Sequence, residues 1–305
     1  MKDAIYDLRR LVALHETLAA LDVTATPTAQ VLIPDPSPPV RRVGILCGSF
    51  NPLTLAHTEL AERTREIARL DLVFFTLAKV TTDKEHVTGL SLEDRLLLLS
   101  LYVQRHAQTG IALVNRGLYF EQAQAFRSAV GEQVELSFIV GMDKLLQILD
   151  AKYYQDRDAA LRQLFALTSL IVANRGAMAR KEFDCILDRP ENRPYRFQIQ
   201  FCPLTETIAD LSATEVRDGL AAGRSVEEWV PPETTAFLAE TRAFRAPLEI
   251  GKEQIDAYAV RQNLLNLLFV RRSQDQGTEE FHALYRRALS EGEAGQELRK
   301  ATSLD

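Results

Sequence analysis

The sequence predicts an α/β protein in which a parallel sheet carries helices on both faces. From residue 43 onward, short apolar runs such as VGILC and LVFFTL alternate with longer segments of helical periodicity. Such alternation is typical of βαβ units and of a sheet that is buried on both sides. A length of 305 residues with a hydrophobic fraction of 46% suffices for one large domain with additions, or for two domains.

An N-terminal segment precedes the alternating region. Residues 3–21 place apolar side chains at helical spacing, which predicts an amphipathic helix. Five prolines follow between Pro27 and Pro39, and they favour an extended tether laid across the body. We therefore expect residues 1–42 to form an N-terminal helix and a proline-rich tether.

The alternating region is expected to span residues 43–245 and to contain six strands. The expected strands are VGILC (43–47), LVFFTL (72–77), IALV (111–114), VELSFIV (134–140), LTSLIVA (167–173) and RFQIQF (196–201). The expected helices lie near 57–69, 91–107, 119–129, from about 143, 158–165 and 178–187.

The last segment, residues 246–305, has a different pattern. The runs 255–272 and 278–292 predict helices, and the breaker-rich SQDQG separates them. No strand pattern is recognised here, so we expect a helical C-terminal extension.

Composition narrows the class of protein. A net charge of −6 argues against general nucleic-acid binding, and no apolar run approaches the ~20 residues of a membrane span. The N-terminus lacks the apolar core of a secretory signal. Cys47, Cys185 and Cys202 show no C-x-x-C spacing, which fits a reduced compartment without a disulfide frame or zinc site. We expect a cytoplasmic protein with neither nucleic-acid nor membrane partners, in which a local cluster holds any anionic ligand.

The first motif lies where the leading strand is expected to end. Gly48 and Ser49 add little bulk, so backbone N–H groups there can approach a phosphate. Thr54 can cap the next helix, and His57 lies in its first turn. A helix start carries partial positive charge, and an imidazole adds a donor for an anion. An isolated histidine is usually an ordinary surface or core residue, but the order Gly-Ser-Phe-Asn-Pro-x-Thr-x-x-His favours an anion site.

A second motif lies in residues 211–238. Ser212 and Glu215 form a capping-box pattern, which by itself explains both residues. Thr214 and Arg217 share the same first turn, so this helix start also offers hydroxyls, free N–H groups and a cation for a polyphosphate.

Both motifs resemble a known family. GSFNPLTLAH resembles the first signature of the nucleotidylyltransferase superfamily, in the form found in nicotinamide and nicotinate mononucleotide adenylyltransferases. Thr54 stands where many bacterial members carry a second histidine and eukaryotic-type members carry threonine. LSATEVR is similar to the second signature, Ser-Ser-Thr-x-x-Arg, with Ala213 in place of the second serine. Two signatures in this order around an α/β pattern are more specific than either alone.

The resemblance implies a Rossmann-like, doubly wound sheet and an ATP site. FIVGMDKLL, residues 138–146, resembles a family segment that would hold the adenosine ribose, although Asp143 could also be a simple N-cap. His57 and Arg217 would be the catalytic groups, acting on the α- or β-phosphate and on the leaving pyrophosphate. The implied ATP contacts are Gly48, Ser49, Phe50, Thr54, His57, Gly141, Asp143, Ser212, Thr214 and Arg217.

The resemblance also implies a site for a pyridine mononucleotide. Lys79 and Lys84 fall in the loop after the second strand, where the family carries a lysine near the phosphate, although solvated surface lysines are the alternative. Family members stack the pyridine ring on tryptophan, but Trp229 does not match that position. The aromatic candidates are Tyr119, Phe120, Tyr153 and Tyr154. The implied mononucleotide contacts are Ser49, Lys79, Lys84, Tyr153 and Asn174, with Arg175 as an alternative to Asn174.

The implied reaction joins ATP to nicotinamide or nicotinate mononucleotide and releases pyrophosphate. The attacking phosphate is already a nucleophile, so the protein needs to align and stabilise rather than supply a base. Mg²⁺ would be held mainly by the substrate phosphates, with no metal site in the protein. Transfer to another phosphate substrate and a non-catalytic, nucleotide-binding regulatory role are the alternatives. The two extensions either pack on the core or form a homo-oligomer contact.

Overall fold

The structure is a computed structural model that describes residues 2–33, 40–80, 89–173, 180–203, 211–271 and 278–302. The strands are β1 (Ala29–Ile33), β2 (Arg42–Cys47), β3 (Leu72–Ala78), β4 (Thr109–Val114), β5 (Glu135–Gly141), β6 (Thr168–Ala173), β7 (Ile199–Cys202), β8 (Leu248–Ile250) and β9 (Glu253–Ile255).

The α-helices are α1 (Lys2–Ile5), α2 (Leu8–Ala20), α3 (Leu55–Ala68), α4 (Leu92–Val103), α5 (Tyr119–Val130), α6 (Met142–Leu149), α7 (Arg157–Leu167), α8 (Arg180–Leu187), α10 (Ala213–Ala221), α11 (Pro232–Thr241), α12 (Ala257–Arg271), α13 (Thr278–Ala288) and α14 (Glu293–Thr302). The 3₁₀ helices are η1 (Ala151–Tyr153), η2 (Arg193–Gln198) and η3 (Glu227–Trp229). Within the described ranges, none of the helices has the length and apolar character needed to span a membrane.

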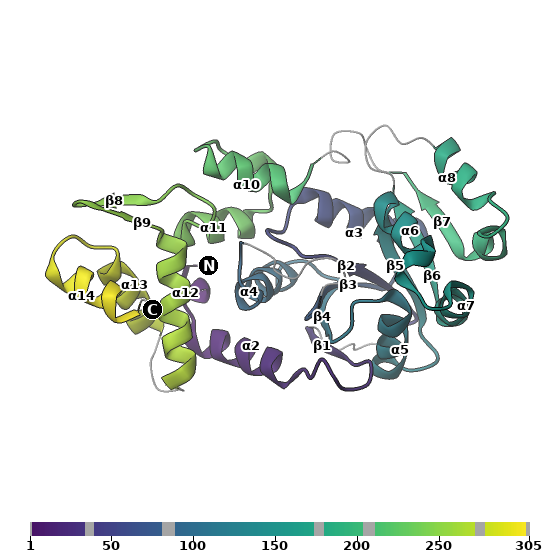
Figure 1. Ribbon diagram of the computed structural model, residues 1–305, viewed down its shortest axis with the longest axis horizontal. Coiled ribbons are helices and arrows are strands. Elements are labelled where there is room, and N and C mark those ends of the chain that lie inside the picture. The colour runs from purple at the N-terminus through teal and green to yellow at the C-terminus, as the bar shows by residue number, and fades with distance from the viewer. Residues whose placement is uncertain are drawn as a thin grey trace.

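The main sheet has the order β1-β4-β3-β2-β5-β6-β7. All neighbouring pairs are parallel except β1 with β4. The chain runs outward from β2 to β4 and then returns to β5 on the other side of β2, which confirms the predicted doubly wound fold (Figure 1). In such sheets ligands bind beyond the carboxyl ends of the strands at the point of reversal. That point lies between β2 and β5.

Two hydrophobic cores lie on opposite faces of this sheet. Successive strand residues alternate between them, as the two-residue period requires: Phe74 belongs to one core and Phe75 to the other. One core is closed by helices α5 to α8. The other is closed by α3, α4, α10, α11 and helices of both extensions. The apolar runs of the strands are therefore explained by burial on both faces.

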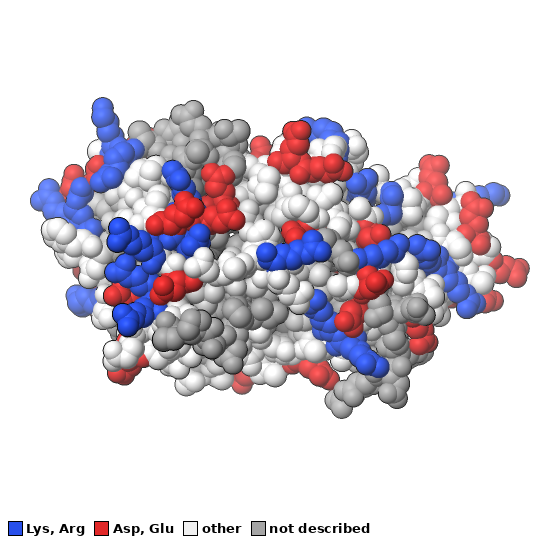
Figure 2. All heavy atoms as spheres, turned by 180° about the vertical axis from the view of Figure 1, so that it is seen from behind, with Lys and Arg blue, Asp and Glu red and all other residues white. Residues whose placement is uncertain are grey.

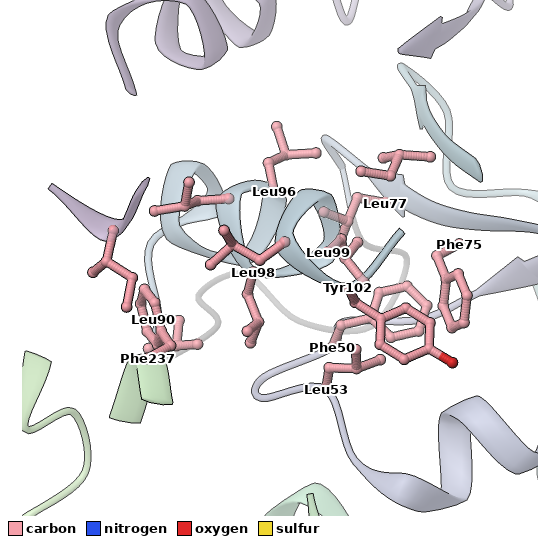
Figure 3. Packing of buried hydrophobic residues seen from close by; sticks show 14 of the residues in the cluster. Phe50, Leu53, Phe75, Leu77, Leu90, Leu96, Leu98, Leu99, Tyr102 and Phe237 are labelled. Atoms are coloured by element: carbon pink, nitrogen blue, oxygen red, sulfur yellow. The ribbon is translucent and has the colours of Figure 1, made fainter. Parts of the chain in front are cut away.

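Helix α4 lies inside the second core. Every residue from 94 to 103 is buried. Figure 3 shows why the leucine run is needed: Leu99 points toward the sheet near Leu77, while Leu98 lies on the side facing Phe237 of α11. A helix that is apolar on all sides is typical of such a buried position.

The extensions differ in part from the sequence prediction. Residues 29–33, expected as tether, form β1, which pairs antiparallel with β4 at the sheet edge. The C-terminal region contains the hairpin β8–β9, where no strand was expected, and the additional helix α14. The first half of the expected strand RFQIQF lies in η2, so β7 begins only at Ile199. Residues 34–39 lie outside the described part of the chain.

Helix α2 packs on α4 (Figure 1), and α12 of the C-terminal extension reaches α4 through the side chains of Tyr258 and Arg261. Asp94 of α4 and Arg261 of α12 are fully buried and form an ion pair, with Nη2 2.8 Å from Oδ1 and Nε 3.2 Å from Oδ2. Arg261 also donates to the carbonyl of Ile5 in α1, at 3.1 Å. The hydroxyl of Tyr258 donates to Asp94 Oδ2 at 2.9 Å. This cluster joins the two ends of the chain to the core.

Candidate active site

The turn after β2 is shaped by one aromatic ring. Phe50 is fully buried and has a φ of 44°, which places its ring beneath Gly48. A Cβ at Gly48 would lie 2.9 Å from that ring, so only glycine fits. The N–H of Gly48 donates to Thr76 O at 3.2 Å, which corrects the expectation that it is free for a phosphate. The exposed Ser49 is the next residue of this turn.

His57 is oriented by the start of its own helix. Thr54 is the N-cap of α3, and its backbone N–H donates to His57 Nδ1 at 3.1 Å. A backbone N–H can only donate, so Nδ1 accepts and the neutral ring carries its proton on Nε2. The Thr54 hydroxyl lies 2.8 Å from the same Nδ1. The rings of Phe50 and His57 pack in a T-shaped arrangement, with their centroids 5.1 Å apart. The buried side chains of Thr54 and Phe50 thus support His57.

The second motif meets the first through Arg217. Its Nη1 donates to the carbonyl of Asn51 at 2.7 Å, and its Nη2 donates to the Thr214 hydroxyl at 2.9 Å. Asn51 is itself held by the Leu90 N–H, which donates to Oδ1 at 2.9 Å. Residues 166 positions apart are therefore joined, and the starts of α3 and α10 lie together.

Ser212 has the role that the capping-box alternative gave it. It is the N-cap of α10, and its hydroxyl lies 2.9 Å from Glu215 Oε2 while accepting from the Glu215 N–H at 3.2 Å. The hydroxyl is therefore used within the helix cap, and a contact from it to ATP would require breaking that cap.

Asp143 lies at the end of β5 but does not cap α6. The N-cap is Gly141, and Asp143 is the second helical residue with an exposed side chain. The N-cap alternative is therefore wrong. A carboxylate is left at the reversal point of the sheet, where it can accept hydrogen bonds from sugar hydroxyls.

A pocket of about 260 Å³ opens at the carboxyl ends of β2 and β3, and Gly48 and Ser49 of the turn that leads toward α3 belong to its lining. It is mostly apolar, and the described residues that line it include Arg95 and Lys144 but no Asp or Glu. An anionic ligand with an aromatic ring suits such a lining. The lining residues are Cys47, Gly48, Ser49, Thr76, Leu77, Ala78, Val80, Arg95, Gly117, Leu118, Tyr119, Gln122, Lys144, Gln147, Ile148, Tyr153 and Tyr154.

Arg95 and Lys144 were missed as site residues. Arg95 of α4 is 9% exposed, and its Nη1 donates to the Ser49 carbonyl at 3.3 Å. Burial lowers the pKa of Arg95, yet a guanidinium remains charged at neutral pH. Lys144 of α6 donates to Gln147 Oε1 at 2.5 Å. A cation inside the apolar run LEDRLLLL was the available signal for Arg95.

Lys79 is corrected from ligand to structural residue. Its ammonium donates to the carbonyls of Leu18 and Leu21 at 2.6 and 2.7 Å, so it binds the end of α2 rather than the pocket. Lys84, Asn174 and Arg175 lie outside the described residues.

Tyrosines, and not the tryptophan, surround the pocket. Tyr119, Tyr153 and Tyr154 belong to its lining, whereas Phe120 does not. The Tyr154 hydroxyl donates to the Ile148 carbonyl at 2.9 Å, which fixes that ring. Trp229 packs on α10, where its ring would lie 3.1 Å from a Cβ at Gly219, and has a structural role.

Cys47 is expected to be unreactive although it lines the pocket. Its thiol donates to Gln122 Oε1 at 3.1 Å, and burial raises the pKa of the thiol to about 12, against the opposing effect of Lys144. At pH 8 only roughly one thiol in 10,000 is then ionised, and the thiolate is the nucleophile. Iodoacetamide at pH 8 should therefore modify the exposed Cys185 and spare Cys47. Peptide mass spectrometry measures both rates, and equal labelling would contradict the prediction.

Acidic and basic side chains are mixed over the surface of one face of the molecule (Figure 2). Figure 2 shows acidic and basic side chains interspersed over the face opposite that of Figure 1. Among the described residues, no group of three or more His, Cys, Asp or Glu side chains is placed to hold a metal ion.

Comparison with known proteins agrees with this geometry. A probable nicotinate-nucleotide adenylyltransferase of Syntrophotalea carbinolica is 28% identical over 227 residues, which cover 67% of this chain and 98% of that protein. A protein of the same description from Bordetella pertussis is 26% identical and is covered to 99%. Among solved structures, Plasmodium falciparum nicotinic acid mononucleotide adenylyltransferase complexed with NaAD has a TM-score of 0.50 at 14% identity, with coverage of 66% and 95%, and shares the fold.

The sequence model of the cytidylyltransferase-like family matches residues 45–219, which is more than half of the chain. The matched range begins in β2 and ends within α10, so it contains both helix starts and the pocket. The chain belongs to the cytidylyltransferase-like family of nucleotidyltransferases.

Proposed function

We propose that this protein transfers the adenylyl group of ATP to nicotinate mononucleotide. A phosphate oxygen of the mononucleotide attacks the α-phosphorus of ATP, and the bond from that phosphorus to the oxygen bridging to the β-phosphate breaks. Pyrophosphate is the leaving group, and nicotinate adenine dinucleotide is the other product. The observation that carries the proposal is the bond from Arg217 to the Asn51 carbonyl. It holds the N-terminal regions of α3 and α10 together, and each helix N-terminus is a natural site for a phosphate group.

The pocket and the end of β5 suit the two parts of the product. The pocket lies at the ends of β2 and β3, is completed by residues that follow β4 and β5, and offers aromatic and cationic side chains for a pyridine mononucleotide. The half of the sheet that begins with β5 carries Gly141 and Asp143, which we assign to the adenosine ribose. The phosphates then lie at the reversal point, where the α3 turn and α10 meet.

We assign charge stabilisation to His57 and Arg217. The Nε2–H of His57 is a donor whose position is fixed by Thr54, and it is proposed to donate to the α- or β-phosphate. Arg217 is proposed to hold the leaving pyrophosphate. Donors fixed before the reaction stabilise the charge that develops in the transition state, and alignment of the two phosphates lowers the barrier further.

Mg²⁺ is proposed to arrive with ATP as part of the substrate. The groups that surround the phosphate position are hydrogen-bond donors, such as imidazole and guanidinium, whereas Mg²⁺ prefers oxygen ligands. Among the described residues, these side chains do not fit a resident magnesium ion, and we propose that the phosphates and water supply its ligands.

Product formation from each mononucleotide, measured side by side, tests the function. With ATP, we expect kcat/KM for the nicotinate form to exceed that for the nicotinamide form by about tenfold or more, because a pocket with Arg95 and Lys144 favours the additional carboxylate. Chromatography identifies the dinucleotide, and coupled detection measures pyrophosphate. Turnover with other phosphate acceptors or with CTP alone would change the substrate, and ATP binding without pyrophosphate release would indicate a regulatory protein.

A further inference from the structure

The N-terminal segment of residues 18–28 lies against the rim of the pocket. It runs from the end of α2 to the start of β1, outside the part of the chain that matches the family. Three side chains of the core bind its backbone, and Lys79 is the first. Its ammonium donates to the carbonyls of Leu18 and Leu21 at the end of α2, where the Leu18 carbonyl also accepts from the Leu21 N–H at 3.3 Å.

Asn115 holds the middle of the same segment. Its Nδ2 donates to the carbonyls of Asp22 and Thr26 at 2.8 and 2.9 Å. Its Oδ1 accepts from the Thr28 N–H at 2.8 Å. The side chain is 1% exposed, so these bonds are shielded from water.

Arg116 completes the attachment. Its Nη1 donates to the Val23 carbonyl at 2.8 Å, and its Nη2 donates to the Ala25 carbonyl at 2.5 Å. Bonds from a charged donor are stronger than neutral ones. The segment thus supplies mainly carbonyl acceptors to donors of the core, and the Thr28 N–H is the donor in the one bond to Asn115 Oδ1.

Lys79, Asn115 and Arg116 lie next to, or within two residues of, pocket-lining residues in the sequence. Lys79 stands between Ala78 and Val80, and Arg116 precedes Gly117 and Leu118. From inside the pocket, Gln122 donates to the carbonyls of residues 116 and 117 at 3.0 and 3.2 Å. The rim is therefore fixed from the inside by Gln122 and from the outside by the N-terminal segment.

We propose that the N-terminal segment is a positioning element that orders the acceptor side of the pocket before the mononucleotide binds. Lys79, Asn115 and Arg116 are its positioning residues. The inference rests on the proposed function, because it assigns the pocket to the acceptor. Preorganised loops bind a ligand more tightly because less ordering is left to binding. Loosening the segment should weaken acceptor binding and leave ATP binding unchanged.

The test replaces Lys79 with methionine, which keeps the length of the side chain and removes its donors. For Lys79→Met we expect KM for nicotinate mononucleotide to rise about tenfold, while KM for ATP and kcat change by less than about twofold. Titration calorimetry with nicotinate mononucleotide alone should show the same weakening. Lys79→Arg, which keeps a cation, should restore most of the affinity. Lys252→Met, at an exposed lysine in the β8–β9 turn, is the matched control and should behave as wild type.

The outcomes separate the inference from the function. A wild-type protein that forms no dinucleotide overturns both. An active wild type whose Lys79→Met variant keeps its acceptor KM, or loses affinity for both substrates equally, overturns the inference alone. Should Lys79→Met fail to fold, Arg116→Met carries the same test at a partly exposed side chain.

Discussion

Replacing His57 with alanine is expected to lower kcat about 100- to 1,000-fold while the protein stays folded, with a loss of about 1–2 kcal/mol in the free energy of unfolding because the buried Thr54 N–H loses its acceptor. The size of the change in kcat follows from losing one preorganised donor to a developing anion. The imidazole is half-buried, and it is oriented through Nδ1 so that Nε2 is the donor. Initial rates of pyrophosphate release measure the loss, and urea denaturation measures the stability.

A matched histidine serves as control for that experiment. His106 stacks on Tyr102 with ring centroids 3.8 Å apart and does not line the pocket. His106→Ala should therefore keep turnover within about twofold of wild type, because no catalytic donor is lost. A folded His57→Ala variant with near-normal turnover would show that this imidazole does not act on the phosphates.

Most of the sheet could be predicted because burial on both faces leaves a strong pattern. The run LVFFTL corresponds to β3, and the alternation of its residues between two cores explains why it is uniformly apolar. Strand β1 could not be found in the same way. Its existence depends on pairing with β4, some eighty residues later, and its flanking prolines indicated a tether. The three-residue strands β8 and β9 are too short for any periodicity.

In the candidate site, too, the residues of local motifs could be predicted, and the residues that depend on contacts distant in sequence could not. The turn at Gly48, the histidine at the helix start and Arg217 are local motifs, and the structure brings them together. The bonds of Lys79 to the end of α2 could not be predicted, because their acceptors lie about sixty residues earlier, outside any local window. Arg95 was overlooked because the Ser49 carbonyl that it contacts lies 46 residues earlier in the sequence.

Breaking the buried ion pair between Asp94 of α4 and Arg261 of the C-terminal extension is expected to have the largest effect on the free energy of unfolding. Arg261→Met should lower the free energy of unfolding by about 3–5 kcal/mol, because Asp94 is then left buried without its counterion. The hydroxyl of Tyr258 still donates to Asp94, but one neutral donor does not replace a guanidinium. Urea denaturation, followed by circular dichroism, measures the change.

Two further variants identify the cause of that loss. Arg299→Met breaks a pair with Glu253 Oε2 at 2.6 Å and removes the donor to the carbonyls of Ala288 and Ser290, but Glu253 is 38% exposed, so we expect a smaller loss of stability than for Arg261→Met. Combining Arg261→Met with Asp94→Leu should recover much of the stability, because no unpaired buried charge remains. If the double variant is as unstable as Arg261→Met, the loss comes from packing around Arg261 and not from the orphaned carboxylate. Since α4 carries both Asp94 and Arg95, recovery of stability without recovery of turnover would show that this pair also holds Arg95 at the pocket.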